Sequence, residues 1–411
     1  MSVIKVEIDP VEVGMDSARL QRIGKHFRSY VDDGRLPGWS MVIARENQVV
    51  YHDQYGFADI ESKSPITQDT LFRIYSMTKP ITSVALMILY EEGKVELTDP
   101  VSKYIPSFAQ PMVFVGGGSN DPTLRPATEP MRIWHLLTHT SGLTYGFLYA
   151  NPVDTIYRNN GFEWGSPKGL SLAETVDKFA EMPLLFNPGS EWNYSVATDV
   201  LGRVVEVASG MALDEFFKTR IFEPLKMVDT AFYVQESDAE RLATLYLRAP
   251  EPEKTSRIDF MGDLAKTKPT SPSGGGGLIS TLSDYHRFTQ MLQNRGTLEG
   301  ARILGSKTLG YMTENHLPGN QDLQKFGRPI FAETNYDGVG FGLGFSVVID
   351  HRATKSVSSL GQYGWGGAAS TTFWVDPLED ITAVFMTQLL PSSSYPIRPQ
   401  LAQLVYQSIV D

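Results

Sequence analysis

The chain has 411 residues, 47 acidic against 36 basic side chains and no cysteine, so its formal net charge is 36 − 47 = −11. The absence of cysteine excludes disulfides, thiolate zinc sites, iron–sulfur clusters and cysteine nucleophiles. The acidic balance argues against a nucleic-acid partner, because phosphate contacts need clustered Lys and Arg. With 42% hydrophobic and 20% charged residues, the composition is that of a folded globular protein, and the length favours two structural lobes.

Neither a membrane span nor a secretory signal is predicted. The longest core-like apolar run, 81–90, falls well short of the roughly 20 residues that a spanning helix needs. The first 16 residues have little basic charge and no extended apolar segment. We therefore expect a cytoplasmic protein with no membrane partner, and the sequence leaves its oligomeric state open.

The first hundred residues combine helices and strands. Apolar residues at helical spacing predict a helix over 17–31, and β-rich segments predict strands over 38–45 and 48–58. Glu46 and Asn47 between these strands suit a hairpin turn, which indicates antiparallel pairing. A further helix is expected over 79–92, before a glycine suited to a helix end.

The middle of the chain, 97–266, has a helical pattern. Helices are expected over 131–138, 171–181 and 199–209, joined by two long loops, 111–130 and 145–168. Loops of that length in compact domains are more often functional than inert.

The last part of the chain returns to strands. After the glycine-rich stretch 273–277, a helix is expected over 278–294, four strands follow, and a final helix covers 398–410. The expected strands are 340–349, 356–363, 368–375 and 381–386, each with several β-branched or aromatic residues. This order predicts an α/β fold, with a discontinuous sheet domain (1–96 and 267–411) and a mainly helical inserted domain (97–266).

Ser76 and Lys79 form the first candidate for chemistry. A serine hydroxyl needs an adjacent base to act as a nucleophile, and a lysine three positions later lies on the same helical face. Ser-x-x-Lys is a loose pattern, with an accidental second match at Ser2 and Lys5. The apolar residues that follow Lys79 indicate a buried helix, which makes the match at Ser76 and Lys79 more significant than the one at Ser2 and Lys5.

Two further segments are weak signals individually. Tyr194 follows a turn-forming stretch, and a tyrosine near cationic groups can serve as a general base or acid, although simple packing is its commoner role. Trp365, Gly366, Gly367 and Ala368 lie in the C-terminal strand region. Two glycines in a strand indicate close approach of a ligand or of another backbone, or else a bulge.

Other motifs lack the required context. His135 and His139 have the spacing of zinc ligands, but the Glu of the metalloprotease pattern and a third ligand are missing. The glycine runs 116–118 and 274–277 are not followed by Lys-Ser or Lys-Thr. No Gly-x-Ser-x-Gly elbow is present. We therefore expect neither a metal nor an organic cofactor.

In combination and in this order, these motifs resemble the serine β-lactamase and penicillin-binding-protein superfamily. The chain is most similar to the class C β-lactamase-like branch and, within it, to family VIII carboxylesterases, over about residues 15–408. The segments typical of that branch are 72–79, 135–143, 187–189 and 274–281. The resemblance implies an antiparallel sheet flanked by helices, with an inserted all-helical lobe.

The resemblance also implies a mechanism and a site. Ser76 would attack an acyl carbonyl, Lys79 and Tyr194 would share the proton transfers, and the backbone N–H groups of Ser76 and Ala368 would form the oxyanion hole. Trp365 stands where β-lactamases have a lysine that binds the antibiotic carboxylate, and Val196 replaces an asparagine of the class C pattern. Both departures weaken β-lactam recognition.

The sequence therefore predicts a serine carboxylesterase that acts on short-chain esters as small-molecule substrates. We expect Trp365, Gly366, Gly367, Phe147 and Tyr149 to bind the substrate, with Tyr157 and Trp164 as further candidates for the pocket wall. The alternatives are an acyltransferase on the same fold, whose statin-type members the segment 140–147 also resembles, then a β-lactamase or D-amino-acid peptidase. A non-catalytic scaffold is the last alternative.

Overall fold

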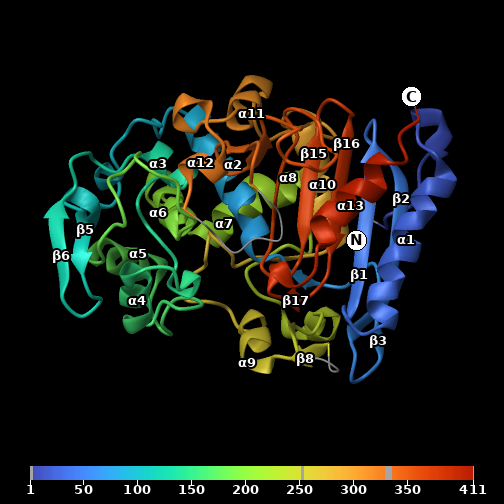
Figure 1. The fold of residues 1–411 in the computed structure, drawn as a ribbon, viewed down its shortest axis with the longest axis horizontal. Helices are drawn as coiled ribbons and strands as arrows, with labels where there is room; N and C mark the ends of the chain where they lie inside the picture. Colours follow the sequence, from blue (N-terminus) through green and yellow to red (C-terminus); the bar gives the residue numbers. More distant parts are fainter. Residues whose placement is uncertain (1–2, 251–253, 329–335, 411) are drawn as a thin grey trace.

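A computed structural model describes residues 3–250, 254–328 and 336–410. Its main sheet is antiparallel and has eight strands in the order β12-β13-β14-β15-β16-β1-β2-β3 (Figure 1). These strands are β1 Gly38–Arg45, β2 Gln48–Asp59, β3 Ser64–Pro65, β12 Val339–Phe341, β13 Ser346–Val348, β14 Tyr363–Gly366, β15 Thr372–Asp376 and β16 Ile381–Met386.

The two ends of the chain meet in this sheet. β1 pairs with β16, from Ser40 opposite Met386 to Arg45 opposite Ile381. The predicted hairpin of β1 and β2 is confirmed; Glu46 and Asn47 have φ values of 53° and 61°, the left-handed conformation of a tight hairpin turn. None of the described residues of 97–266 forms a strand of the main sheet, and the division into two domains stays a prediction.

The predicted helices at both ends and in the middle are present, with ends shifted by a few residues. The helices are α1 Ser17–Asp32, α2 Thr78–Glu91, α3 Ile133–Leu137, α4 Pro152–Asn159, α5 Leu172–Glu181, α6 Ala197–Ser209, α7 Leu213–Phe217, α8 Glu223–Leu225, α9 Asp259–Gly262, α10 Leu282–Gln293, α11 Ser306–Met312, α12 Leu323–Phe326 and α13 Ile397–Tyr406. The smaller strands are β4 Phe72–Arg73, β5 Met112–Gly117, β6 Pro122–Pro126, β7 Tyr246–Arg248, β8 Thr255–Arg257, β9 Ile279–Ser280, β10 Thr297–Leu298, β11 Ala301–Arg302 and β17 Leu389–Leu390.

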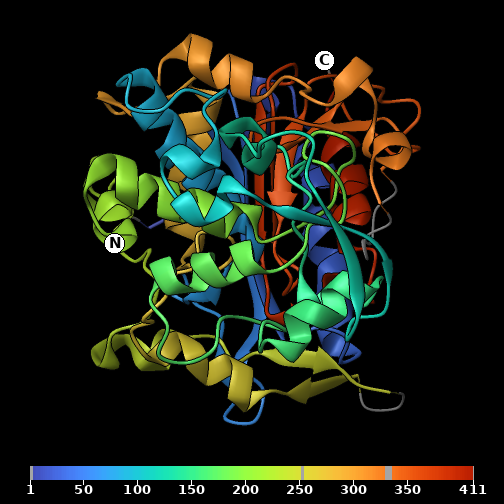
Figure 2. The same cartoon turned by 90° about the vertical axis from the view of Figure 1, so that its left-hand side faces the viewer.

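Each face of the main sheet is covered by helices. α1 and α13 pack together over one face, where residues such as Phe27 and Leu401 form a buried cluster with side chains of β1 and β16. α10 packs on the opposite face against β1, β15 and β16. Figures 1 and 2 show α3 to α7 beside this sandwich, and α2 contacts α6 and α7. α2 is thus buried between the sheet side and the helical side of the molecule.

Two predicted loops contain regular structure. Residues 111–130 include the antiparallel hairpin of β5 and β6, where a bulge between Phe114 and Gly116 disrupts the alternation that would have indicated a strand. Residues 145–168 include α4, whose start is marked by the capping residue Asn151 followed by Pro152. The expectation of irregular loops was wrong in both segments.

The C-terminal strand prediction was wrong in three places. The segment 340–349 turns back on itself at Gly344, which has φ 95°, and forms β12 and β13. Residues 356–362 are irregular, since the hydroxyls of Thr354 and Ser358 bond to nearby carbonyls and compete with strand pairing. The strand expected over 368–375 begins only at Thr372. The helix expected over 278–294 begins only at Leu282, because Ile279 and Ser280 form the short strand β9.

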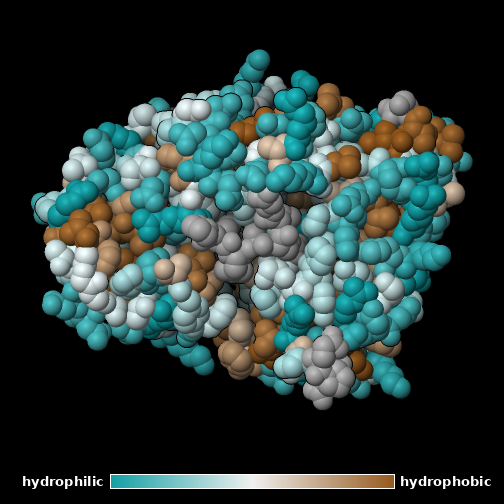
Figure 3. Space-filling view, in the orientation of Figure 1, coloured by the Kyte–Doolittle hydropathy of each residue, from teal (hydrophilic) through white to brown (hydrophobic). Residues whose placement is uncertain are grey.

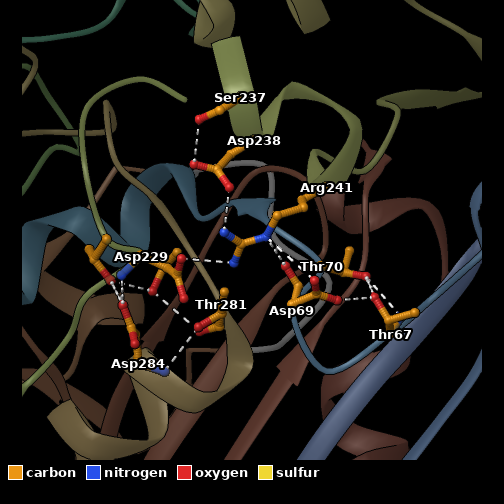
Figure 4. Close-up of polar contacts among 11 residues, drawn as sticks. Thr67, Asp69, Thr70, Asp229, Ser237, Asp238, Arg241, Thr281 and Asp284 are labelled. Atoms are coloured by element: carbon orange, nitrogen blue, oxygen red, sulfur yellow. Dashed lines mark hydrogen bonds and ion pairs between the residues drawn. The ribbon is translucent and has the colours of Figure 1, made fainter. Parts of the chain in front are cut away.

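An ion-pair network fixes the start of α10 (Figure 4). Arg241 contacts three carboxylates, those of Asp69, Asp229 and Asp238. The backbone N–H of Asp229 donates to Asp284 on α10 at 2.8 Å. One residue further on, the Tyr285 hydroxyl donates to the carbonyl of Met77 at 2.9 Å. The network therefore supports the turn that immediately precedes α2.

The surface is mainly hydrophilic in the view of Figure 3, with apolar residues in several small patches, one of them at the end of the molecule formed by β5 and β6. Val115 and Leu124 of that hairpin are 51% and 37% exposed. Within the described ranges, no helix combines the length and the apolar character that crossing a bilayer requires.

The buried His286 on α10 gives a testable pH dependence. Burial, with the charges of Arg287 and His52, lowers its pKa from 6.5 to about 4. The folded state thus keeps His286 neutral while the unfolded chain binds a proton below pH 6.5, so stability is lost as the pH falls from 6.5 towards 4. We expect the free energy of unfolding to fall by about 1–2 kcal/mol more between pH 7 and pH 5 in the wild type than in His286→Gln.

The measurement is urea unfolding at both pH values. Asp284, whose pKa burial raises to about 6, and His135, whose pKa burial lowers to about 4, are present in both proteins, so their contributions cancel in the comparison. An equal pH dependence of the two proteins would contradict the assignment.

Candidate active site

Ser76 lies in a tight turn just ahead of the buried helix α2. The 3-10 turn Tyr75–Met77 leads directly into α2, and Tyr75 has φ 42°, a conformation that side-chain-bearing residues rarely adopt. This sharp turn presents Ser76 at the wall of the cavity described below. The hydroxyl also lies near the positive end of the α2 dipole, where a developing oxyanion is favoured.

Lys79 occupies the first turn of α2 and is 2% exposed. Its Nζ lies 3.3 Å from Ser76 Oγ, 3.0 Å from the Tyr145 hydroxyl and 2.7 Å from the carbonyl oxygen of Gly275. Three acceptors match the three N–H donors of an ammonium group. In the neutral amine, bonds to Gly275 and Tyr145 would leave the lone pair directed at Ser76. These contacts therefore hold the Lys79 amine against the Ser76 hydroxyl.

Tyr194 lies beside the Lys79 amine and is 8% exposed. Lys79 Nζ is 4.5 Å from the centre of its ring, and the Trp365 indole N–H donates to its hydroxyl at 3.4 Å. Tyr194, Trp365 and Ser76 line one cavity. The structure thus brings together the three predicted catalytic residues and the predicted binding residue Trp365.

The two glycines after Trp365 allow the end of β14 to pass close to the turn that carries Ser76. A Cβ on Gly367 would lie 2.4 Å from the carbonyl oxygen of Ile74, and one on Gly366 would overlap the Arg398 guanidinium. Arg398, on α13, donates to the Gly367 carbonyl at 3.2 Å. Ala368 follows and lines the cavity with Ser76, as the predicted oxyanion hole requires.

The buried carboxylate of Asp199 holds the loop that binds the Lys79 amine. Asp199, on α6, accepts hydrogen bonds from Ser273 Oγ at 2.5 Å and from the backbone N–H of Gly275 at 3.1 Å. The carbonyl of the same Gly275 accepts from Lys79, so Asp199 fixes the loop that orients the amine. A Cβ on Gly275 would lie 2.5 Å from Asp199 Oδ2, so a larger residue at this position would clash with the carboxylate. Burial raises the pKa of Asp199, and the Lys79 charge opposes that rise.

Tyr145 and Asp199 are functional residues that our sequence reasoning missed. Burial, together with the charges of Asp199 and Tyr194, holds the pKa of Tyr145 well above 10, so its hydroxyl is protonated at neutral pH. The signal for Tyr145 was its place directly after the typical segment 135–143. Asp199 follows Tyr194 by five residues, which does not reveal its contact with a loop some 75 residues away.

The two histidines considered as zinc ligands serve the local structure. His139 is buried, and its Nδ1 lies 3.1 Å from Ser195 Oγ. Burial and the nearby Lys79 lower its pKa well below 6.5, so the ring is neutral. His135 Nδ1 accepts from the backbone N–H of Arg132. Across the described part of the chain, no group of three or more potential ligands could hold a metal ion.

The cavity has a volume of about 340 Å³. Phe147 and Trp365 both line it, whereas Tyr149 is 59% exposed, lies against Arg158 and is not among the lining residues. Tyr157 is fully buried in the core. Among the cavity-lining residues on the described part of the chain, two are basic and none is acidic. These are Ser76, Phe147, Tyr194, Tyr336, Val339, Ser346, Val348, Thr354, Lys355, Ser356, Val357, Ser358, Gln362, Tyr363, Gly364, Trp365, Gly366, Gly367, Ala368, Thr372, Phe373, Trp374, Ser392, Arg398, Pro399, Ala402 and Gln403.

This geometry fits acyl transfer through a serine nucleophile. A buried amine at hydrogen-bonding distance from a serine hydroxyl can act as a base, a tyrosine beside it can carry a second proton, and backbone N–H groups at the cavity wall can donate to an oxyanion.

The family model described as Beta-lactamase matches residues 23–407, and the chain therefore belongs to this family. The chain also has the β-lactamase and penicillin-binding-protein-like fold that the sequence predicted, with its mixture of helices and antiparallel sheet.

Relatives place the chain in the class C β-lactamase-like superfamily with family VIII esterases. Esterase EstB of Burkholderia gladioli is 30% identical over 97% of this chain and 98% of its own length. Protein Rv1367c of Mycobacterium tuberculosis is 35% identical over 90% of both chains. The solved structure of EstCE1, a hydrolase with promiscuous acyltransferase activity, superposes with a TM-score of 0.79, at 29% identity, over 95% of this chain and 99% of that one. The predicted resemblance is confirmed.

The contact between Tyr145 and Lys79 predicts a kinetic effect. Tyr145→Phe removes one of the three acceptors of Lys79 while keeping the ring. Since a hydrogen bond to a charged group contributes about 1.5–3 kcal/mol, labelling of Ser76 by a fluorophosphonate should slow by roughly 10- to 100-fold. Labelling is followed by intact-mass spectrometry, with Tyr311→Phe, a change at an exposed tyrosine on α11, as the control. An unchanged rate in Tyr145→Phe would show that Tyr145 does not orient Lys79.

Proposed function

We propose that the protein is a family VIII-type serine carboxylesterase that hydrolyses short-chain carboxylic esters through an acyl-enzyme on Ser76. The observation that carries the proposal is the contact of Ser76 Oγ with the buried amine of Lys79 at 3.3 Å, at the wall of a cavity shared with Tyr194 and Ala368. The similarity to Esterase EstB over nearly the whole of both chains supports ester substrates.

In the acylation step, Ser76 Oγ attacks the ester carbonyl and its proton passes to Lys79. The backbone N–H groups of Ser76 and Ala368 stabilise the tetrahedral oxyanion. The carbon–oxygen bond to the alcohol then breaks, and Tyr194, beside Lys79, delivers the proton to the leaving alkoxide.

In the deacylation step, water takes the place of the alcohol and runs the same proton transfers in reverse. It gives up a proton to the Lys79 and Tyr194 pair, attacks the acyl carbonyl and releases the carboxylic acid, while Ser76 regains its proton.

The environment of Trp365 favours neutral esters over β-lactams. Trp365 stands where β-lactamases have a carboxylate-binding lysine, and its indole N–H is directed to Tyr194. A missing charged hydrogen bond to a carboxylate weakens binding by about 1.5–3 kcal/mol, which is tenfold or more. Val196 is 5% exposed and offers no side-chain amide to the substrate.

Ester turnover is expected to depend on Ser76. The wild type should hydrolyse p-nitrophenyl acetate and butyrate faster than the laurate, and open a chromogenic cephalosporin slowly or not at all. Ser76→Ala should lower ester turnover by at least ~10³-fold, since the nucleophile is lost. The surface variant Ser107→Ala is the control. Rapid cephalosporin turnover would favour a β-lactamase, and a protein that neither turns over nor labels with a serine probe would favour a scaffold.

Acyl transfer is the second candidate function, because EstCE1 combines hydrolase and acyltransferase activity on the same fold. With p-nitrophenyl butyrate as donor and 1-propanol as acceptor, gas chromatography measures propyl butyrate against butyrate. For a hydrolase, we expect butyrate to remain the main product at millimolar propanol, because water at about 55 M competes for the acyl-enzyme. Propyl butyrate as the main product under these conditions would identify the protein as an acyltransferase.

A further inference from the structure

An aromatic column leads from the catalytic lysine to the surface. We define it as Tyr145, Phe147 and Trp164. The rings of Tyr145 and Phe147 stack with centroids 4.6 Å apart at 24°, and those of Phe147 and Trp164 with centroids 5.4 Å apart at 5°. At the inner end, the Tyr145 hydroxyl accepts the hydrogen bond from Lys79. At the outer end, Trp164 is 59% exposed.

The backbone around the column is fixed before any ligand binds. Gly146, between Tyr145 and Phe147, lies so close to the chain before Trp164 that a Cβ there would be 2.3 Å from the carbonyl oxygen of Phe162. Arg158 of α4 donates to the carbonyl of Gly146, which ties the backbone of Tyr145 and Phe147 to α4. Tyr157 of α4 and Phe162 pack against Phe179 of α5, which anchors the chain before Trp164 in the core. A pre-formed surface loses little conformational entropy when it binds a ligand.

The outer part of the column is costly as a purely structural feature. An indole that is more than half exposed buries little area, and exposed aromatic surface beside a cavity marks a place where a ligand removes it from water. Phe147 itself lines the cavity that contains Ser76. Ring-to-ring contact prefers stacked or edge-to-face geometry, which a flat ligand ring achieves and a saturated ring does not.

We propose that Phe147 and Trp164 form an aryl-binding site, so that the preferred substrates are esters that carry an aromatic ring close to the scissile bond. This inference rests on the proposed esterase function and names its substrate class. The ring meets the edge of Phe147, whose faces stack with Tyr145 and Trp164, while the carbonyl lies at Ser76, and the exposed side of Trp164 offers a further aromatic surface to ligands that extend outwards. The ring belongs either to the alcohol or to the acyl part of the ester, and these two cases require separate substrate pairs.

The test compares kcat/KM for substrate pairs that differ only in the ring. Benzyl acetate against cyclohexylmethyl acetate examines the alcohol side, and methyl phenylacetate against methyl cyclohexylacetate examines the acyl side. In the wild type, the aromatic member of at least one pair should be favoured by about two- to tenfold, which is the usual contribution of aromatic pairing.

Two variants keep the apolar volume and remove the ring. Phe147→Leu and Trp164→Leu should each bring the aromatic-to-saturated ratio towards one, chiefly through a higher KM for the aromatic member. Any change in ethyl acetate turnover reports a general effect on the site and cancels in the aromatic-to-saturated ratio, and Trp164→Phe should retain most of the preference. The matched control is Trp134→Leu, which removes another exposed indole that faces His316 instead of the column.

Equal losses on both members of each pair, or no preference in the wild type, would overturn the aryl-binding site. These outcomes are distinct from failure of the proposed function. If Ser76-dependent hydrolysis of ethyl acetate is absent, the esterase itself is refuted. If that hydrolysis is present and the ring preference is absent, only the aryl-binding site is refuted. Circular dichroism melts of both leucine variants show whether each is folded.

Discussion

The burial of the Lys79 amine in the first turn of α2 is the constraint on which this candidate active site depends. Lys79 is 2% exposed, and a lysine removed from water in this way is strongly unfavourable unless its N–H groups find acceptors. The three acceptors come from three separate parts of the chain: the nucleophile turn, the segment after α3 and the glycine-rich loop. Satisfying the amine therefore requires these parts to assemble in one arrangement, and that arrangement places Ser76 in the cavity.

The surrounding structure holds each acceptor in place. Asp199 fixes Gly275 through two hydrogen bonds, and the Arg241 network fixes α10, whose Tyr285 supports the backbone just before α2. The end of β14 completes the site, because Gly367 just after it lets the chain approach Ile74 closely. The β-lactamase-family fold thus supplies a rigid frame for acyl transfer, and residues such as Trp365 and Phe147 at the cavity wall adjust which substrate fits.

Much of this could be predicted from local sequence. The amphipathic pattern of α1, the turn at Glu46 and Asn47 and the apolar run of α2 specify their structures within a few residues. The β5–β6 hairpin and the split of 340–349 could not be predicted in the same way. A bulge and a glycine in the left-handed conformation interrupt the period-two pattern there, and close contacts between distant backbone segments determine the shape.

For the site, the sequence by itself predicted the contact of Ser76 with Lys79, the proposed nucleophile and base, because the two residues are one helical turn apart and their contact is local. Tyr194, Trp365 and Ala368 followed from resemblance to a family, and the tertiary structure brings them to one cavity. Only the tertiary structure decided the roles of Tyr145, Asp199 and Gly275, and the exclusion of Tyr149 from the cavity wall. The reason is physical: a hydrogen bond between residues 66 or more positions apart depends on how helices and loops pack, which no local spacing encodes.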